Sequence, residues 1–183
     1  MIHTSEENEK GAAIQVAQLM AAAARTAPKS CGIDAIETLV LDGEDKSRLT
    51  SMMKEIGTKE DKAYFIRDAG NIDACHCVVL IGVHAEPRGW KSPWSVDCGL
   101  CGIGNCAETG KKGIPCAMAL TDLGIAIGSA AAAAMDHRID NRILYTAGFA
   151  ASKLKLFPDN VNVCFAIGLA TKGKNIFFDR PAG

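Results

Sequence analysis

The feature that most constrains this chain is a set of four cysteines in a short, glycine-rich segment. Their spacing is Cys98-x2-Cys101-x4-Cys106-x9-Cys116. The first three thiolates are close enough in sequence to surround one inorganic centre, and the fourth follows just beyond them. Four cysteine thiolates are the usual ligands of a [4Fe–4S] cluster. We therefore predict that Cys98, Cys101, Cys106 and Cys116 bind such a cluster.

The residues beside these cysteines suit an anionic centre. Gly99, Gly102 and Gly104 allow backbone conformations with positive φ, in which N–H groups can point at cluster sulfurs. Cys116 follows Pro115 and precedes an alanine-rich stretch, so we expect it to open a helix. The positive end of that helix would then face the cluster.

Two alternatives to a cluster stay open at this stage. A structural zinc site also uses four cysteines and the Cys-x2-Cys spacing. Typical zinc ligands come as two such pairs, whereas nine residues separate Cys106 from Cys116. The third interpretation is a group of cysteines that bind no metal.

The remaining cysteines carry weaker signals. Cys75 and Cys77 share one face at strand spacing and could form a second redox site or an auxiliary ligand pair. They could equally be small apolar residues leading into a buried strand. Cys31, in a loop, could line a pocket, and Cys164 sits in an apolar run that predicts a core position.

Segment 84–116 differs from the rest of the chain. It is rich in glycine and proline, and it shows neither helical nor strand periodicity. Such a long loop needs another reason to be ordered, and metal binding would supply it. We expect Trp90 and Trp94, which flank the motif, to shield the cluster from solvent.

The other residues predict a single α+β or α/β domain that spans positions 1–183. Apolar periodicity predicts helices and β-branched runs predict strands. Gly57 is expected to end the second helix. The predicted helices cover 11–27, 45–56, 117–135 and 149–156, and the predicted strands cover 36–41, 77–83, 142–146 and 161–169.

Charge and termini restrict the classes of function. The net charge is −1, with acids and bases intermixed, so no basic face for nucleic acid is expected. Residues 1–10 are acidic rather than positively charged, which argues against a signal peptide. Thr121, Asp122 and Ser129 interrupt the apolar stretch 117–135, which favours a buried helix over a membrane span. We expect a cytoplasmic protein with reduced thiols and no membrane association.

Two resemblances concern the cysteines and the whole chain. The motif is similar to the cluster-binding segment of the corrinoid iron–sulfur protein and related small [4Fe–4S] domains, where the last spacing is usually longer. The chain as a whole resembles a family of bacterial and archaeal proteins described as containing a ferredoxin domain. The whole-chain resemblance brings no known activity. The first functional hypothesis, from the predicted cluster, is a redox protein that passes single electrons through it, alone or to a partner protein or small-molecule acceptor.

A further resemblance, to the nitroreductase fold, lies outside the cysteine segment. It rests on AAARTAPKS at 22–30, on DLGIAIGSAAAAA at 122–134, and on FPDN at 157–160 followed by the strand 161–170. It implies a nitroreductase-like α+β sandwich of a mixed β-sheet with helices, in which 84–116 is an inserted cluster-binding loop. It also implies a homodimer.

The nitroreductase resemblance implies a candidate FMN site as well. Lys172, Lys174 and Arg180 fall where that family has basic residues near the flavin phosphate, and Ser30 ends the matching helix segment. The family's Arg-Ser-x-Arg element has no counterpart in residues 1–12, and Arg25 is the candidate substitute. A second hypothesis is thus an oxidoreductase in which the cluster feeds electrons to FMN. A third is a non-enzymatic sensor or scaffold stabilised by a metal bound to the four cysteines.

Overall fold

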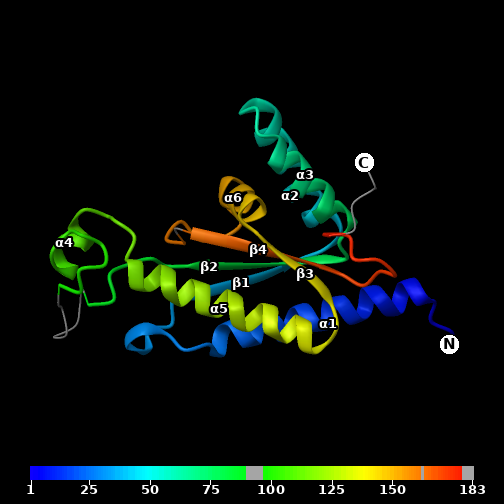
Figure 1. Cartoon of the computed structure of the whole chain (residues 1–183), viewed down its shortest axis with the longest axis horizontal. Coiled ribbons are helices and arrows are strands. Elements are labelled where there is room, and N and C mark those ends of the chain that lie inside the picture. Colours follow the sequence, from blue (N-terminus) through cyan, green and yellow to red (C-terminus); the bar gives the residue numbers. More distant parts are fainter. Residues whose placement is uncertain (90–96, 162, 179–183) are drawn as a thin grey trace.

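A four-stranded sheet forms the centre of the computed structural model, which describes residues 1–89, 97–161 and 163–178 (Figure 1). Trp90, Trp94 and Arg180 therefore lie outside the described residues. The strands lie in the order β1-β2-β4-β3. They are β1 (Ile36–Leu41), β2 (Cys77–Val83), β3 (Asp140–Leu144) and β4 (Val163–Ala170).

Every ladder in the described part of this sheet is antiparallel, so the sheet is not the mixed one that was expected. The register fixes which segments share an end of the sheet. Val83, at the end of β2, pairs with both Ile36 and Val163. Cys77, at the start of β2, pairs with Leu169. Segments that follow β2 and precede β1 therefore meet at one end, and the segment after β4 lies at the other.

Helices cover both faces of the sheet (Figure 1). On β2, Val79 and Ile81 face the core formed with α1 and α5, whereas Val78 and Leu80 face the core formed with α2, α3 and α6. This alternation follows from the two-residue period of a strand. The helices are α1 (Ser5–Thr26), α2 (Gly43–Lys59), α3 (Ala63–Ala74), α4 (Cys106–Lys111), α5 (Ala117–Asp136) and α6 (Tyr145–Lys153), with a 3-10 turn η1 at Ser30–Gly32.

Helices α1, α2 and α5 and strands β1 and β2 were predicted well, whereas α3, α4 and the start of α6 were not. Strands β1 and β2 have the predicted bounds, and α5 extends one residue past its predicted end. Helix α1 begins earlier than predicted because Thr4 and Glu7 form a capping box at its start. Helices α3 and α4 were not predicted, and α6 begins at Tyr145, where the sequence predicted a strand.

Gly57 does not end α2, which continues to Lys59. A Cβ atom on Gly57 would lie 2.7 Å from a side-chain atom of Ile66 and 3.1 Å from Phe65. The glycine is thus required for close packing of α3 on α2 rather than for a helix terminus.

Helix α5 is long and apolar enough to cross a membrane by length and composition alone, with a mean hydropathy of 1.5. The core helix of a soluble protein passes the same test. In this fold, Ala119, Leu123, Ala126 and Ala130 are buried in the core that α5 shares with α1 and the sheet.

Candidate metal centre

The cysteine segment projects beyond the end of the sheet at which β2 finishes (Figure 1). Its base is tied to the core by backbone hydrogen bonds. The N–H of His84 donates to the carbonyl of Ala35 at 2.9 Å, and the N–H of Cys116 donates to the carbonyl of Ala85 at 2.8 Å. The chain therefore leaves β2 and enters α5 at neighbouring points, with the cysteine segment between them.

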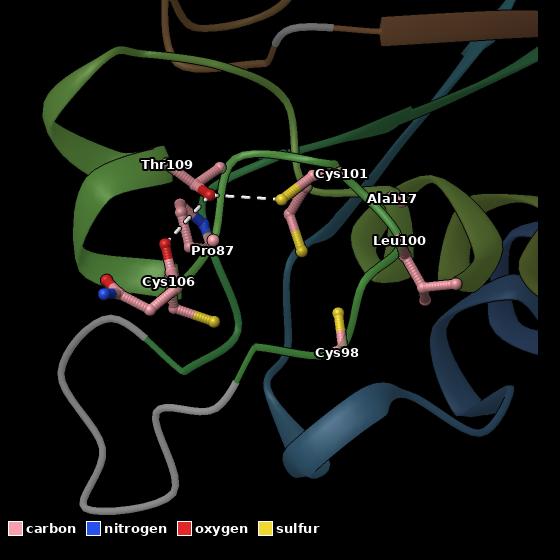
Figure 2. A pocket seen from close by; sticks show the side chains of 10 residues that line it. Pro87, Cys98, Leu100, Cys101, Cys106, Thr109 and Ala117 are labelled. Carbon is pink, nitrogen blue, oxygen red and sulfur yellow. Dashed lines mark hydrogen bonds between the residues drawn. The ribbon is translucent and has the colours of Figure 1, made fainter.

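The four predicted ligands line one pocket. Cys98 is exposed, Cys101 and Cys106 are half-buried, and Cys116 is buried. Figure 2 shows the sulfur atoms of Cys98, Cys101 and Cys106 directed toward a common space, whereas Leu100 points away from it. None of the four forms a disulfide. Cysteines from the loop and from the start of α5 therefore line the same pocket.

The backbone around the pocket adopts the conformations expected for a glycine-rich metal loop. Gly99, Gly102 and Gly104 have φ of 72°, 69° and 103°, a region in which side chains with a Cβ are strained. The carboxylate of Asp97 accepts a hydrogen bond from the N–H of Gly99 at 2.9 Å. Gly99 therefore lies in a turn of the loop between Cys98 and Cys101.

Thr109 contacts one ligand directly. Its hydroxyl lies 3.2 Å from the sulfur of Cys101 and 3.1 Å from the carbonyl oxygen of Asn105, and it can donate its one proton to either acceptor (Figure 2). The hydrogen bond from Thr109, followed by a backbone N–H at Ile103, lowers the pKa of Cys101 below its usual value. Cys101 is thereby biased toward the thiolate, which is the form that binds metal.

Cys116 is the N-cap residue of α5, and no side chain caps this helix end. The first N–H groups of a helix carry partial positive charge, and they favour an anion placed beside them. Because Cys116 also lines the pocket, the start of the 20-residue helix adjoins the space between the cysteines. Cys116 thus opens a helix, as the sequence predicted.

Four cysteine thiolates can hold either a single zinc ion or an iron–sulfur cluster, and the two centres require different separations between the sulfurs. Tetrahedral zinc, with Zn–S distances of about 2.3 Å, brings its four sulfurs to within roughly 4 Å of one another. The described residues contain no group of three or more His, Cys, Asp or Glu side chains that could hold one metal ion. A four-iron cluster gives each thiolate its own iron, so it requires a wider ring of sulfurs around a shared pocket.

Comparison with known proteins places the chain in a family. An uncharacterized protein from Archaeoglobus fulgidus is 36% identical over 185 residues, covering 96% of each chain. The family model described as "Uncharacterized protein containing a ferredoxin domain (DUF2148)" matches residues 112–180. The chain belongs to this ferredoxin-domain family. The matched segment includes Cys116 and lies after the other three predicted ligands.

Solved structures show that this ferredoxin-domain protein has a nitroreductase-like fold. A nitroreductase with bound FMN from Desulfitobacterium hafniense superimposes with a TM-score of 0.58, covering 95% of this chain and 81% of the other, at 16% identity. A putative nitroreductase in complex with FMN from Desulfovibrio desulfuricans gives a TM-score of 0.57, covering 92% and 79%, at 13% identity. The predicted α+β nitroreductase-like class is therefore confirmed.

Two of the residues predicted to contact FMN already have partners within the ferredoxin-domain chain. Arg25 forms an ion pair with Asp34 at 2.7 Å, and its guanidinium also donates to the carbonyl of Ile36 at 2.9 Å. The hydroxyl and N–H of Ser30 donate to the carboxylate of Asp122 at 2.7 and 2.8 Å. Both lie near the start of β1, at the same end of the sheet as the cysteine pocket.

Lys172 and Lys174 follow β4 and lie at the opposite end of the sheet. The seven residues of β2 separate the two ends, which corresponds to about 20 Å of extended strand. Arg180 is outside the described residues. Within one chain, the structure thus brings Arg25 and Ser30 to one end and the two lysines to the other, rather than joining them in one site.

The remaining cysteines are separated from the pocket. Cys75, Cys77 and Cys164 are buried, and desolvation raises the pKa of each to about 12. Buried thiols of this kind are inert, which agrees with the interpretation of these cysteines as small apolar residues. Cys31 is exposed in η1.

Sequence reasoning missed Thr109 and the short helix that positions it. Asn105 caps α4 by accepting a hydrogen bond from the N–H of Glu108 at 3.0 Å. Asn followed three residues later by Glu is a recognisable start signal for a helix, and it was available in the sequence. Sequence reasoning also missed the buried Arg88, whose partner Asp122 lies 34 residues further along the chain.

Proposed function

We propose that this protein is an iron–sulfur electron-transfer protein that binds a [4Fe–4S] cluster through Cys98, Cys101, Cys106 and Cys116. The observation that supports it most is that these four cysteines line one pocket. The description of the matching family model as containing a ferredoxin domain supports an iron–sulfur role. Bound there, the cluster would supply one-electron oxidation and reduction.

The chain's own groups would do three things for such a cluster. The four thiolates would bind it, and the Thr109 hydroxyl, by lowering the pKa of Cys101, would favour the thiolate form of that ligand. The first N–H groups of α5, beside Cys116, favour its negative charge. Hydrogen bonds and positive charge near the sulfurs both raise the reduction potential of a cluster.

The cysteines on the two sides of the pocket differ in solvent exposure, which indicates the side from which a partner can exchange electrons. Cys98 is exposed and Cys116 is buried, so the Cys98 side of the pocket faces solvent and the Cys116 side faces the core. Leu100, beside Cys98, is 57% exposed and offers an apolar contact at the open rim. We infer that a redox partner or small-molecule acceptor exchanges electrons from the Cys98 side.

The test is anaerobic purification followed by absorbance, iron, sulfide, zinc and flavin analysis of one sample. We expect about four irons and four sulfides per chain. Cys101→Ser should abolish the visible chromophore, whereas Cys31→Ser, which changes an exposed thiol in η1, should leave it intact. Stoichiometric zinc with no chromophore would contradict the proposal and support the metal-stabilised scaffold. Full iron in the Cys101→Ser protein would remove Cys101 from the ligand set.

A flavin-dependent oxidoreductase is the second candidate function. It is favoured by the likeness to nitroreductases whose structures contain FMN. Since Ser30 and Lys172 lie at opposite ends of the sheet, one FMN would need groups from two chains. Bound flavin in the purified protein, or tight binding of added FMN that Lys172→Ala weakens, would support this candidate. Absence of FMN binding by protein that carries the cluster would contradict it.

A further inference from the structure

A nearly inaccessible ion pair lies beside the cysteine pocket. The Nε of Arg88 donates to the carboxylate of Asp122 at 3.0 Å, and their side chains are 5% and 2% exposed. Among the residues that the structure describes, Arg88 is the only buried lysine or arginine. Neither residue belongs to the thiol ligands or to the predicted FMN set.

The pair joins three segments that surround the base of the cysteine segment. Arg88 also donates to the carbonyl of His84 at 3.2 Å, directly after β2. Asp122 belongs to α5 and accepts two hydrogen bonds from Ser30 of η1. The start of segment 84–116, the second turn of α5 and η1 are thereby held together through two buried side chains.

Stability alone does not account for this arrangement. Removing two charges from water costs several kcal/mol per ion before their attraction is counted, and well-packed apolar residues often serve a fold as well or better. The Nη2 atom of Arg88 is also buried without a hydrogen-bond partner among the described residues. An incompletely satisfied buried cation calls for a role other than packing.

The position of the pair supplies that role. Arg88 follows Pro87, which lines the cysteine pocket. Asp122 lies six residues after Cys116 on α5, which is about 9 Å along the helix axis. At this range, in a poorly solvated interior, a charge acts strongly on a neighbouring anionic centre. Any change in charge at Arg88 or Asp122 would therefore be felt in the pocket.

We propose that Arg88 and Asp122 are positioning residues of the cluster site: they fix the cysteine segment on α5, and their opposite charges set the electrostatic potential at the cluster. This inference rests on the proposed function. It assigns Arg88 the effect of stabilising the reduced, more negative cluster, and Asp122 the opposite effect. Ser30 orients Asp122 from the other side.

The test compares cluster-loaded wild-type protein with Arg88→Met, Asp122→Asn and Arg88→Lys at pH 8. The midpoint reduction potential is measured by EPR-monitored titration, and circular dichroism checks that each protein is folded. Loss of the Arg88 charge should shift the potential to more negative values. Loss of the Asp122 charge should shift it to more positive values. Arg88→Lys, which keeps the charge, should stay near the wild type.

The outcomes separate this inference from the proposed function. A wild-type protein that binds no cluster would defeat the proposed function itself. A cluster-loaded wild type whose variants show no shift, or shifts of the same sign, would overturn this inference alone, because a purely structural role predicts no dependence on the sign of the removed charge. If Arg88→Met does not fold, Asp122→Asn and Arg88→Lys decide the question, since the first should shift the potential to more positive values and the second should leave it near the wild-type value.

A second measurement tests positioning without using the potential. The double variant Arg88→Met, Asp122→Asn removes both charges, so it leaves no unpaired ion in the core. We expect it to unfold thermally like the wild type as apo-protein, but to lose cluster iron to a chelator several-fold faster. Wild-type rates of iron loss from a folded double variant would contradict a positioning role.

Discussion

The backbone N–H of Cys116 donates a 2.8 Å hydrogen bond to the carbonyl oxygen of Ala85. This bond joins the two ends of the cysteine segment, one just after β2 and the other at the start of α5. The hydrogen bond closes the segment at its base, and the contacts of the folded core on either side offset the entropy of closing it.

Hydrogen exchange of the apo-protein tests this closure. The amide of Cys116 is buried and hydrogen-bonded, so we expect it to be protected to nearly the same degree as amides of β2. The exposed stretch around Gly99 and Gly102 should exchange much faster. Mass-spectrometric exchange with peptide resolution measures both. Exchange of Cys116 as fast as Gly102 would show that the segment is open without metal.

Thr109→Val tests the hydrogen bond to Cys101. Because the Thr109 hydroxyl lowers the pKa of this thiol, its loss should raise the pKa and reduce the thiolate fraction near neutral pH. We expect alkylation of Cys101 in the apo-protein at pH 7 to slow several-fold. Thr121→Val, which removes an exposed hydroxyl from α5, is the matched control. Equal rates in the two variants would contradict a role for Thr109.

The fold was predictable where burial imposes a period on the sequence. The continuous apolar run of β2 is buried along its whole length, and its bounds were predicted correctly. The start of α6 was less predictable, because Tyr145 is aromatic and has strand propensity, whereas in the structure it lies in the helix and its ring contacts Phe149 and Phe165. Phe149 itself was correctly predicted to be helical. Helix α3 was missed although its buried residues Phe65, Ala69 and Ile72 recur at helical spacing in the sequence.

In the candidate site, too, some residues could be predicted from the sequence and others could not. Its ligands could be predicted because cysteine spacing and glycine content are local properties of the sequence. The Arg88–Asp122 pair could not, since it joins residues 34 positions apart through tertiary structure. The residues of the predicted FMN set were chosen from the nitroreductase resemblance, and within one chain they do not lie in one place. Only the strand register places Lys172 at the far end of the sheet from Ser30.

Two helix glycines should respond in opposite directions to alanine. At Gly57 the new Cβ would meet Ile66 at 2.7 Å, so overpacking should cost about 1–3 kcal/mol, partly offset by better helix propensity. Gly70, in α3, has no atom within 4 Å of the new Cβ. Gly70→Ala should therefore stabilise the protein by roughly 0.5–1 kcal/mol. Urea unfolding measures both, and stabilisation by Gly57→Ala would contradict the described helix packing.

Buried and exposed thiols should differ in reactivity. With pKa values of about 12, only about one in ten thousand of the Cys75, Cys77 and Cys164 thiols is ionised at pH 8. Iodoacetamide should modify exposed Cys31 in minutes and these three only after denaturation. Site-resolved mass spectrometry measures the rates. Rapid modification of Cys164 in the folded protein would contradict its buried position.

The same three thiols predict how stability depends on pH. Their pKa values are raised from 9.0 to about 12 by folding, so the unfolded chain loses these protons first. Their contribution is fully present below pH 9, and it is lost as pH rises from 9 toward 12. We expect the unfolding free energy of the apo-protein to fall over this window, and to fall less steeply in Cys164→Ala. Identical slopes in both proteins would contradict the raised pKa of Cys164.

An apolar groove on α5 and the neighbouring strands leads to a last prediction, a homodimer. Leu120 and Ile143 are 38% and 44% exposed at this groove, and contiguous apolar surface of this kind marks an interaction site. The expectation of a second copy rests on the nitroreductase resemblance.

Replacing both residues by glutamate should weaken dimerisation at least about tenfold, because two charges would be buried unpaired. Met135→Glu, on the same helix but outside the groove, should leave the dimer unchanged. Sedimentation equilibrium measures all three proteins, and a monomeric wild type at high micromolar concentration would contradict the prediction.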